Sequence, residues 1–106
     1  MDPAHWGPLV WTLFHTYAAT YPSNPTAADI KAAQTYFQDE FPKRLPCGTC
    51  LKKYHNLVRG YQKLSACHLK SREALFEWTF VVHNTVNMLL KKPLFDLDDA
   101  RRKYRV

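Results

Sequence analysis

The sequence predicts an all-α fold, a four-helix bundle with a short fifth helix, because of how its apolar residues are spaced. Apolar side chains recur at helical intervals in five separate segments, and no segment shows the period-2 alternation of a half-buried strand. Prolines and cap-forming residues separate these segments. The chain has 106 residues, 46% of them hydrophobic, and no internal repeat, which favours a single domain over residues 1–106.

The first two helices are bounded by prolines. The first is expected over residues 6–21, where the apolar positions keep helical spacing: Leu9, Val10, Leu13, Phe14 and Tyr17. The second is expected from Thr26, with Asp29 three residues later resembling a capping pair, to about Phe41. Pro42 and Pro46 follow it, so the chain is expected to leave the helix there.

The other three helices lie in the second half of the chain. A helix is expected to begin at the cysteine pair of residues 47–50 and to end at Gly60. The longest periodic segment begins at Ser71 and runs to the break at residues 91–93. The short fifth helix is expected over residues 96–104.

The positive charge of the chain favours anionic partners but does not show which kind of anion binds. The formal net charge is +6, and residues 101–105 form a basic run near the end. Such a surface attracts nucleic acid, a lipid head group or a phosphate-bearing cofactor. No segment has the roughly 20 apolar residues of a membrane span, and no secretory signal is visible. The sequence therefore predicts a soluble intracellular protein.

Two of the three cysteines form a Cys-x-x-Cys pair, Cys47 and Cys50, at the expected start of a helix. Sulfurs at this spacing are close enough for a small-loop disulfide, and a helix N-terminus stabilises a thiolate. The pattern therefore favours thiol–disulfide exchange. A thioredoxin-like domain would need a βαβ frame, which this sequence does not offer.

Zinc binding is the alternative for the same cysteines. Cys47, Cys50 and Cys67 with either His55 or His68 would supply a three-cysteine, one-histidine ligand set. Structural zinc sites usually combine two close ligand pairs, whereas Cys67 and His68 are adjacent. This alternative implies a zinc-stapled basic module that binds nucleic acid or an acidic partner.

Polar side chains interrupt the apolar faces of the first and the longest helix. His83 and Asn87 share a helical face with Val86, and Trp11 and His15 lie one turn apart. Buried polar groups need hydrogen-bond partners, which they find in one another or in a ligand. A planar heterocycle with a diphosphate would use the rings and amides, with the diphosphate beside the cations Lys91, Lys92 or Lys103. An aromatic bundle core with a solvated basic end explains the same pattern.

Several motifs together resemble the Erv/ALR family of sulfhydryl oxidases. They are Trp6-Gly7-Pro8 with Trp11 and His15, Ala18-Ala19-Thr20-Tyr21-Pro22, Pro46-Cys47-Gly48-Thr49-Cys50, and His83-Asn84-Thr85-Val86-Asn87 followed by Lys92-Pro93. The match runs in order from about Trp6 to Tyr104. The combination of CxxC with HNxVN is more specific than either motif alone.

The resemblance implies an FAD-binding bundle in which two cysteines are catalytic. It implies that Cys50 faces the flavin, that Cys47 is attacked by the incoming thiolate, and that no metal is bound. Its FAD-binding positions correspond here to Gly7, Pro8, Trp11, His15, Tyr54, His83, Asn84, Val86, Asn87, Leu90, Lys92, Lys103 and Tyr104.

The resemblance also implies an activity and partners. The enzyme would oxidise protein dithiols, directly or through a thioredoxin-like relay, and pass the electrons through FAD to O2, giving H2O2. A homodimer is expected, with neither nucleic acid nor membrane as partner. The small size resembles compact forms encoded by large DNA viruses, which would place the protein in the host cytoplasm or the virion.

The sequence departs from many cellular members of that family in its cysteines. Ala74 and Phe80 occupy the region where those members carry a second, stapling cysteine pair. No shuttle pair is present, and Cys67 matches none of the usual cysteines. We therefore expect a minimal enzyme with one redox-active disulfide, for which Cys67 is dispensable.

Overall fold

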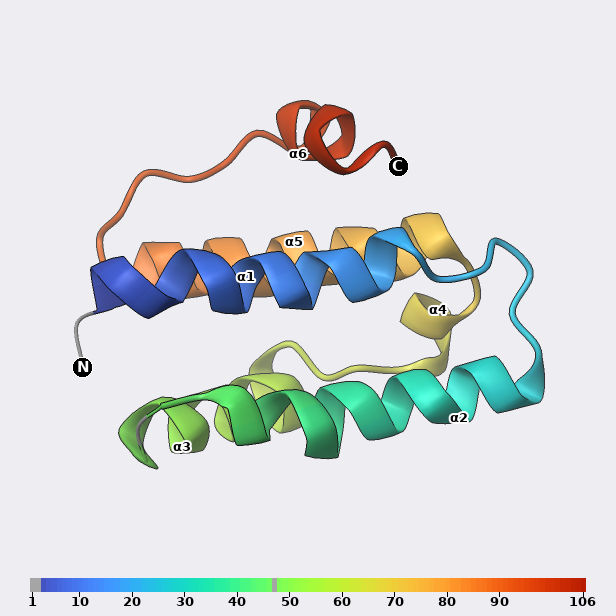
Figure 1. The fold of residues 1–106 in the computed structure, drawn as a ribbon, viewed down its shortest axis with the longest axis horizontal. Helices are drawn as coiled ribbons and strands as arrows, with labels where there is room; N and C mark the ends of the chain where they lie inside the picture. Colours follow the sequence, from blue (N-terminus) through green and yellow to red (C-terminus); the bar gives the residue numbers. More distant parts are fainter. Residues whose placement is uncertain (1–2, 47) are drawn as a thin grey trace.

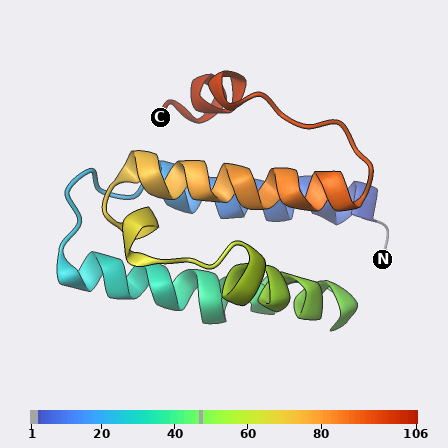
Figure 2. The same cartoon turned by 180° about the vertical axis from the view of Figure 1, so that it is seen from behind.

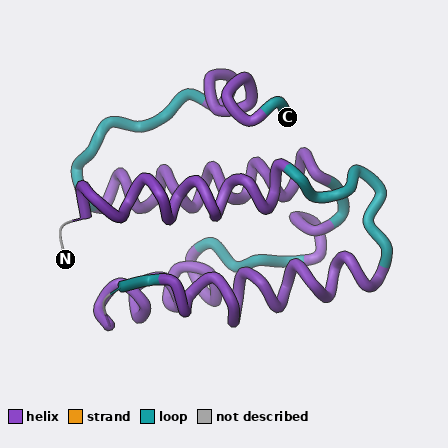
Figure 3. Tube along the Cα trace, viewed as in Figure 1, coloured by secondary structure: helices purple, strands orange, loops and turns teal. Residues whose placement is uncertain are grey.

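The computed structural model describes residues 3–46 and 48–106, with side chains from residue 7 onward. All regular structure in these ranges is helical (Figures 1 and 3), which confirms the predicted all-α class. The α-helices are α1 (Pro3–Ala19), α2 (Ala27–Thr35), α3 (Gly48–Asn56), α4 (Ala66–Leu69), α5 (Arg72–Leu89) and α6 (Leu97–Tyr104). No described helix is long and apolar enough to cross a membrane.

Two of these helices continue into turns of different pitch. A π-helical turn, η1 (Tyr36–Glu40), follows α2 and leads into the 3₁₀ turn η2 (Phe41–Arg44). Another π-helical turn, η3 (Leu57–Tyr61), follows α3. Gly60 lies inside η3, and the backbone N–H of Gln62 donates to the carbonyl of Leu57 at 2.6 Å. The expectation that Gly60 ends this helix is therefore wrong, because the wider turn carries the helix past it.

Side-chain caps mark the helix starts that the sequence indicated. The Thr26 hydroxyl accepts from the Asp29 N–H at 3.1 Å, and the Asp29 carboxylate accepts from the Thr26 N–H at 2.8 Å. Ser71 caps α5 by accepting from the Ala74 N–H at 3.1 Å. These contacts satisfy backbone donors that a helix start leaves unpaired. The short α4 was not predicted, because its four residues are too few to show a period.

The helices lie in layers (Figures 1 and 2). α1 and α5 run side by side as the central layer and pack against each other. α2 and α3 lie on one side of this layer, and α6 lies on the other. An ion pair between Arg101 and Glu77 ties α6 to α5. The cysteine-bearing α3 and the basic α6 are thus both held next to the same central pair of helices.

Aromatic rings make up much of the core, together with buried aliphatic side chains. Phe14 is fully buried, and its ring centroid lies 4.9 Å from that of Phe41 and 5.2 Å from that of Phe37. Leu9 and Leu13 belong to the same apolar stripe of α1 but are 70% and 45% exposed. The apolar stripe of α1 is therefore wider than the face that the core covers.

Candidate functional site

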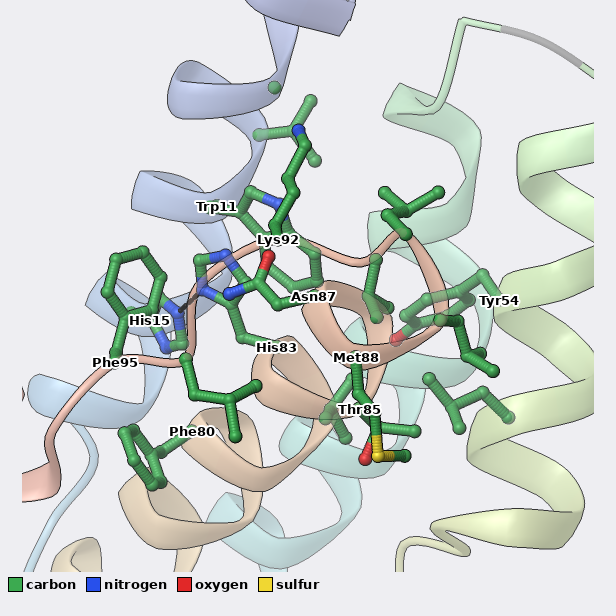
Figure 4. A pocket seen from close by; sticks show the side chains of 18 of the residues that line it. Trp11, His15, Tyr54, Phe80, His83, Thr85, Asn87, Met88, Lys92 and Phe95 are labelled. Atoms are coloured by element: carbon green, nitrogen blue, oxygen red, sulfur yellow. Dashed lines mark hydrogen bonds between the residues drawn. The ribbon is translucent and has the colours of Figure 1, made fainter.

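A cavity of about 1360 Å³ opens beside the central helices, and α1, α3, α5, α6 and the segment before α6 all line it (Figure 4). Pockets for drug-sized ligands measure about 300–1,000 Å³, so this one has room for a larger molecule. Twelve of the thirteen residues predicted to bind FAD line it: Gly7, Pro8, Trp11, His15, Tyr54, His83, Val86, Asn87, Leu90, Lys92, Lys103 and Tyr104. Asn84 is not among the lining residues.

Cys50 lies in the first turn of α3 and lines the same cavity. It is disulfide-bonded and half-buried. Cys47, the other predicted catalytic residue, lies outside the described residues. The position of Cys50 at a helix N-terminus stabilises negative charge on its sulfur whenever the disulfide opens.

Two histidines from different helices form a buried pair in the cavity wall. His15 of α1 and His83 of α5 are 6% and 7% exposed, and His15 Nε2 lies 2.8 Å from His83 Nδ1. The other ring nitrogen of His15, Nδ1, lies 3.0 Å from the hydroxyl of Thr79. A continuous hydrogen-bonded chain therefore joins Thr79 to the cavity through both imidazoles.

Aromatic rings fix the orientation of His83. The indole of Trp11 stacks on it with ring centroids 3.7 Å apart and planes 9° apart. Phe95 meets the same imidazole edge-on, with centroids 4.7 Å apart. Together Trp11 and His83 form an aromatic stack closed at its edge by Phe95, and such rings are surfaces on which planar ligands stack (Figure 4).

Both imidazoles are neutral at physiological pH. Burial lowers the pKa of His15 to about 4, and the charge of Lys103 adds to this effect. Burial likewise lowers the pKa of His83 to about 3, with further contributions from His15, Lys103 and Lys92. The same two lysines line the cavity, so it holds cations beside neutral imidazoles.

Asn87 and Lys92 complete the polar part of the wall. Asn87 is 6% exposed, and its side-chain amide makes no hydrogen bond to any other residue that the structure describes. At the end of α5, Lys91 adopts a left-handed backbone conformation with φ 58°. The chain turns back there, and the N–H of Lys92 donates to the carbonyl of Asn87 at 2.8 Å. This turn places Lys92 next to an amide that is open to a ligand.

The polar groups of Asn84 and Tyr54, both predicted to bind FAD, form hydrogen bonds within the protein. The Asn84 amide makes two hydrogen bonds with the backbone of Phe95, of 2.9 and 3.1 Å, and so fastens the segment before α6 to α5. The Tyr54 hydroxyl donates to the carbonyl of Phe37 at 2.5 Å, and burial raises the pKa of this phenol. Tyr54 therefore offers the cavity its ring, not an acidic proton.

The zinc alternative finds no support in the described part of the chain. No group of three or more histidine, cysteine or acidic side chains gathers there in a way that could hold a metal. Cys67 is an exposed free thiol, whose sulfur lies 3.0 Å from the Ser65 hydroxyl. His68 instead accepts a hydrogen bond from the Ser65 N–H at 3.1 Å, which caps α4.

The sequence did not single out several residues of the cavity wall. Lys53 lies one helical turn after Cys50 on α3, a spacing from which it was predictable. Phe95 comes from a segment with no periodic pattern, and the partnership of Thr79 with His15 joins residues 64 positions apart. Neither the position of Phe95 in the cavity wall nor the contact of Thr79 with His15 could be read from a local sequence pattern.

Comparisons with known proteins agree with this geometry. The sequence profile of the Erv1/Alr family matches residues 8–105. Protein 347L of Invertebrate iridescent virus 6 is 36% identical over 108 residues, which cover 99% of this chain and 96% of the viral protein. The mitochondrial FAD-linked sulfhydryl oxidase ERV1 of Saccharomyces cerevisiae is 34% identical over 104 residues.

The yeast protein is longer than this chain, and its structure shows the same fold. The match covers 98% of this chain but 52% of yeast ERV1. The crystal structure of the FAD binding domain of Erv1 from Saccharomyces cerevisiae superposes with a TM-score of 0.84 at 33% identity. That superposition covers 98% of this chain and 94% of the crystallised domain.

Proposed function

The chain belongs to the Erv1/Alr family, and on that basis we propose that it is an FAD-linked sulfhydryl oxidase whose Cys47 and Cys50 exchange disulfides with protein dithiols. The observation that carries this proposal is that one cavity contains both a disulfide-bonded cysteine and the residues suited to an FAD. Overall, two substrate thiols and O2 give one disulfide and H2O2.

The cavity wall fits the chemistry of FAD. The rings of Trp11 and His83 present flat surfaces to an aromatic heterocycle, and Tyr104 also lines the cavity. The open amide of Asn87 offers a donor and an acceptor. Lys92 and Lys103 supply positive charge for a diphosphate. When bound, the cofactor supplies two-electron redox chemistry that no protein side chain offers.

The cysteines divide the thiol chemistry between them. A substrate thiolate attacks Cys47, and the sulfur of Cys50 leaves as a thiolate that the N-terminus of α3 stabilises. A second substrate thiol displaces Cys47, so the substrate leaves as a disulfide and both cysteines are reduced. The Cys50 thiolate then hands the electron pair on, a role supported by the position of Cys50 in the cavity lining.

A visible spectrum and an oxygen electrode test the proposal together. We expect the purified protein to bind FAD with a flavin absorbance and to consume O2 when dithiothreitol is added. Cys67→Ser is the matched control, because it removes an exposed thiol away from the cavity wall and should keep both properties. A preparation that stays colourless and does not bind added FAD would contradict the proposal.

A homodimer is a finer part of the proposal. Leu9 and Leu13 expose apolar surface one turn apart on α1, which favours association of this face with a second copy. The chain has a mass of 12.4 kDa. Light scattering at micromolar concentration should give twice this mass. Leu13→Glu should give the monomer mass, and a monomeric parent protein would contradict this part.

The physiological route of the electrons is also proposed. We expect protein dithiols to reach the enzyme directly or through a thioredoxin-like relay. The iridescent virus relative supports a site of action in host cytoplasm or virions. Trapping of mixed disulfides with Cys50→Ser, followed by mass spectrometry of the captured protein, identifies the donor. Capture of only small-molecule thiols would contradict a protein substrate.

A further inference from the structure

Thr79 lies behind the cavity wall and not in it. Its side chain is fully buried, and it is not among the residues that line the cavity. The hydroxyl donates to the carbonyl of Phe76 at 2.7 Å and lies 3.0 Å from Nδ1 of His15. Thr79 therefore meets the ligand site only through His15.

The bond from Thr79 to the Phe76 carbonyl fixes the direction of the hydrogen bonds that join Thr79, His15 and His83. A hydroxyl has one proton, and a carbonyl oxygen only accepts, so the Thr79 proton is directed to Phe76. The Thr79 oxygen must then accept from His15, which places the proton of His15 on Nδ1 and leaves Nε2 bare. The bare Nε2 of His15 accepts from Nδ1 of His83 across 2.8 Å, so the remaining nitrogen of His83, Nε2, carries no proton.

Two further features keep this order in place. Burial lowers the pKa of both imidazoles far below neutrality, so neither ring carries a second proton that would reverse a bond. Stacking by Trp11 and the edge contact of Phe95 hold the plane of the His83 ring, which opposes a flip that would put ring carbons where Nδ1 and Nε2 lie. The Nε2 atom makes no hydrogen bond within the described part of the chain, and His83 lines the cavity.

We propose that Thr79 acts through His15 to hold His83 in the tautomer whose Nε2 accepts a hydrogen bond from an amino or hydroxyl group of FAD. This inference rests on the proposed function, because it takes FAD as the occupant of the cavity. Thr79 is a positioning residue, since it acts on a ligand that it does not touch. It converts a histidine that could donate or accept into an obligatory acceptor.

The tautomer is measurable in the FAD-bound parent protein. Proton–nitrogen correlation spectra of 15N-histidine-labelled protein distinguish protonated from bare ring nitrogens, and His→Gln variants of the other histidines assign the signals. We expect His83 to carry its proton on Nδ1 and His15 on Nδ1. Protonation of His83 at Nε2 would overturn the inference while leaving FAD binding, and hence the proposed function, intact. Failure to bind FAD would instead contradict the proposed function.

Variants of Thr79 test whether this residue sets the tautomer. Thr79→Val keeps the shape of the side chain but removes the hydroxyl, which leaves the Nδ1–H of His15 without an acceptor, so we expect the acceptor tautomer of His83 to fall to about a tenth of the total. FAD affinity should then fall about tenfold, because only that tautomer accepts from the ligand. Thr79→Ser restores the hydroxyl and should restore both readouts. Thr20→Val is the control, because its hydroxyl also bonds its own helix but lies exposed at the far end of α1.

The outcomes separate positioning from packing. A purely structural role would make Thr79→Val less stable but leave the tautomer of His83 unchanged, and that result would overturn the inference. Flavin hypoxanthine dinucleotide, which lacks the adenine amino group, distinguishes the two possible donors. If Thr79→Val no longer weakens binding of this analogue, the amino group is the donor. If the tenfold loss persists, the donor is a hydroxyl.

Discussion

Two parts of the cavity wall differ in how firmly their side chains are held. Cys50 is half-buried, and the residues that precede it in α3, Gly48 and Thr49, are exposed. His15 and His83 are buried and are joined in one hydrogen-bonded chain with Thr79, which lies behind the wall. A disulfide that exchanges with another protein has to be reachable, whereas a cofactor is held best by groups fixed before it binds. The cavity combines an open chemical end with a rigid binding wall.

The largest effect is expected at the open end. Cys50→Ser should lower dithiol oxidation at least about a thousandfold, because a serine cannot form or pass on a disulfide. Bound FAD should remain, since the sulfur does not anchor the cofactor. Cys47→Ser should be equally inactive but should show a long-wavelength absorption band, because it leaves a Cys50 thiolate beside the flavin. The band in Cys50→Ser instead would exchange the roles of the two cysteines.

A substitution in the rigid wall should act on binding more than on chemistry. His83→Ala removes from the cavity wall a ring proposed to stack on FAD and to accept one of its hydrogen bonds, a loss of about 2 kcal/mol of binding free energy. FAD affinity should fall about thirtyfold, and the rise in melting temperature on adding FAD should shrink with it. His68→Ala is the control, because His68 does not line the cavity. Equal loss of affinity in both variants would show that the effect is a general destabilisation.

The rigid wall should also make stability depend on pH. The folded pKa values of His15 and His83, about 4 and about 3, lie below the value of about 6.5 in an unfolded chain. Below pH 6.5 the unfolded chain takes up protons that the folded chain refuses, so stability falls as the pH falls towards 4. Each histidine contributes a slope of up to about 1.4 kcal/mol per pH unit.

Comparison with a variant isolates this contribution. Denaturant unfolding of the parent protein and of His83→Gln between pH 7 and 4.5, both with saturating FAD, should give a smaller slope for the variant. Lys92, Lys103 and His15 surround His83 in both proteins, so their charges do not distinguish them. If the dependence of unfolding free energy on pH were the same in both proteins, His83 would have an ordinary pKa in the folded protein, and its imidazole would be less buried than described.

The smallest effect is expected away from both regions. Cys67→Ser changes an exposed thiol that does not line the cavity, so dithiol turnover and FAD content should stay within about twofold of the parent. Oxygen consumption with dithiothreitol measures this directly. A loss as large as that of Cys50→Ser would place Cys67 in the electron path and would end the one-disulfide mechanism.

The sequence predicted the features that local patterns carry. The cap formed by Thr26 and Asp29 is present, and so is the cap of Ser71, because such bonds connect residues three apart. Histidine and asparagine on the apolar face of α5 pointed to a polar site, and His83 and Asn87 do line the cavity.

Features that depend on distant contacts were not predictable in this way. The exposure of Leu9 and Leu13 depends on which part of α1 the other helices cover. The role of Asn84 depends on a backbone segment eleven residues away that has no pattern of its own. The link from Thr79 to His15 exists only once α1 and α5 are packed together. In each case tertiary packing, and not local propensity, decides the outcome.

The π-helical turn η3 bears on which changes in chain length this protein tolerates. A π turn corresponds to one extra residue inserted into an α-helix. Deleting a residue within Leu57–Tyr61 would restore α-helical pitch and leave the end of the turn facing nearly as before, whereas inserting a further residue would rotate it by about 100° relative to α3. Leu57 and Tyr61 both line the cavity, so after an insertion they would no longer face it together. This segment should therefore accept point substitutions and the loss of one residue, but not the insertion of a further one.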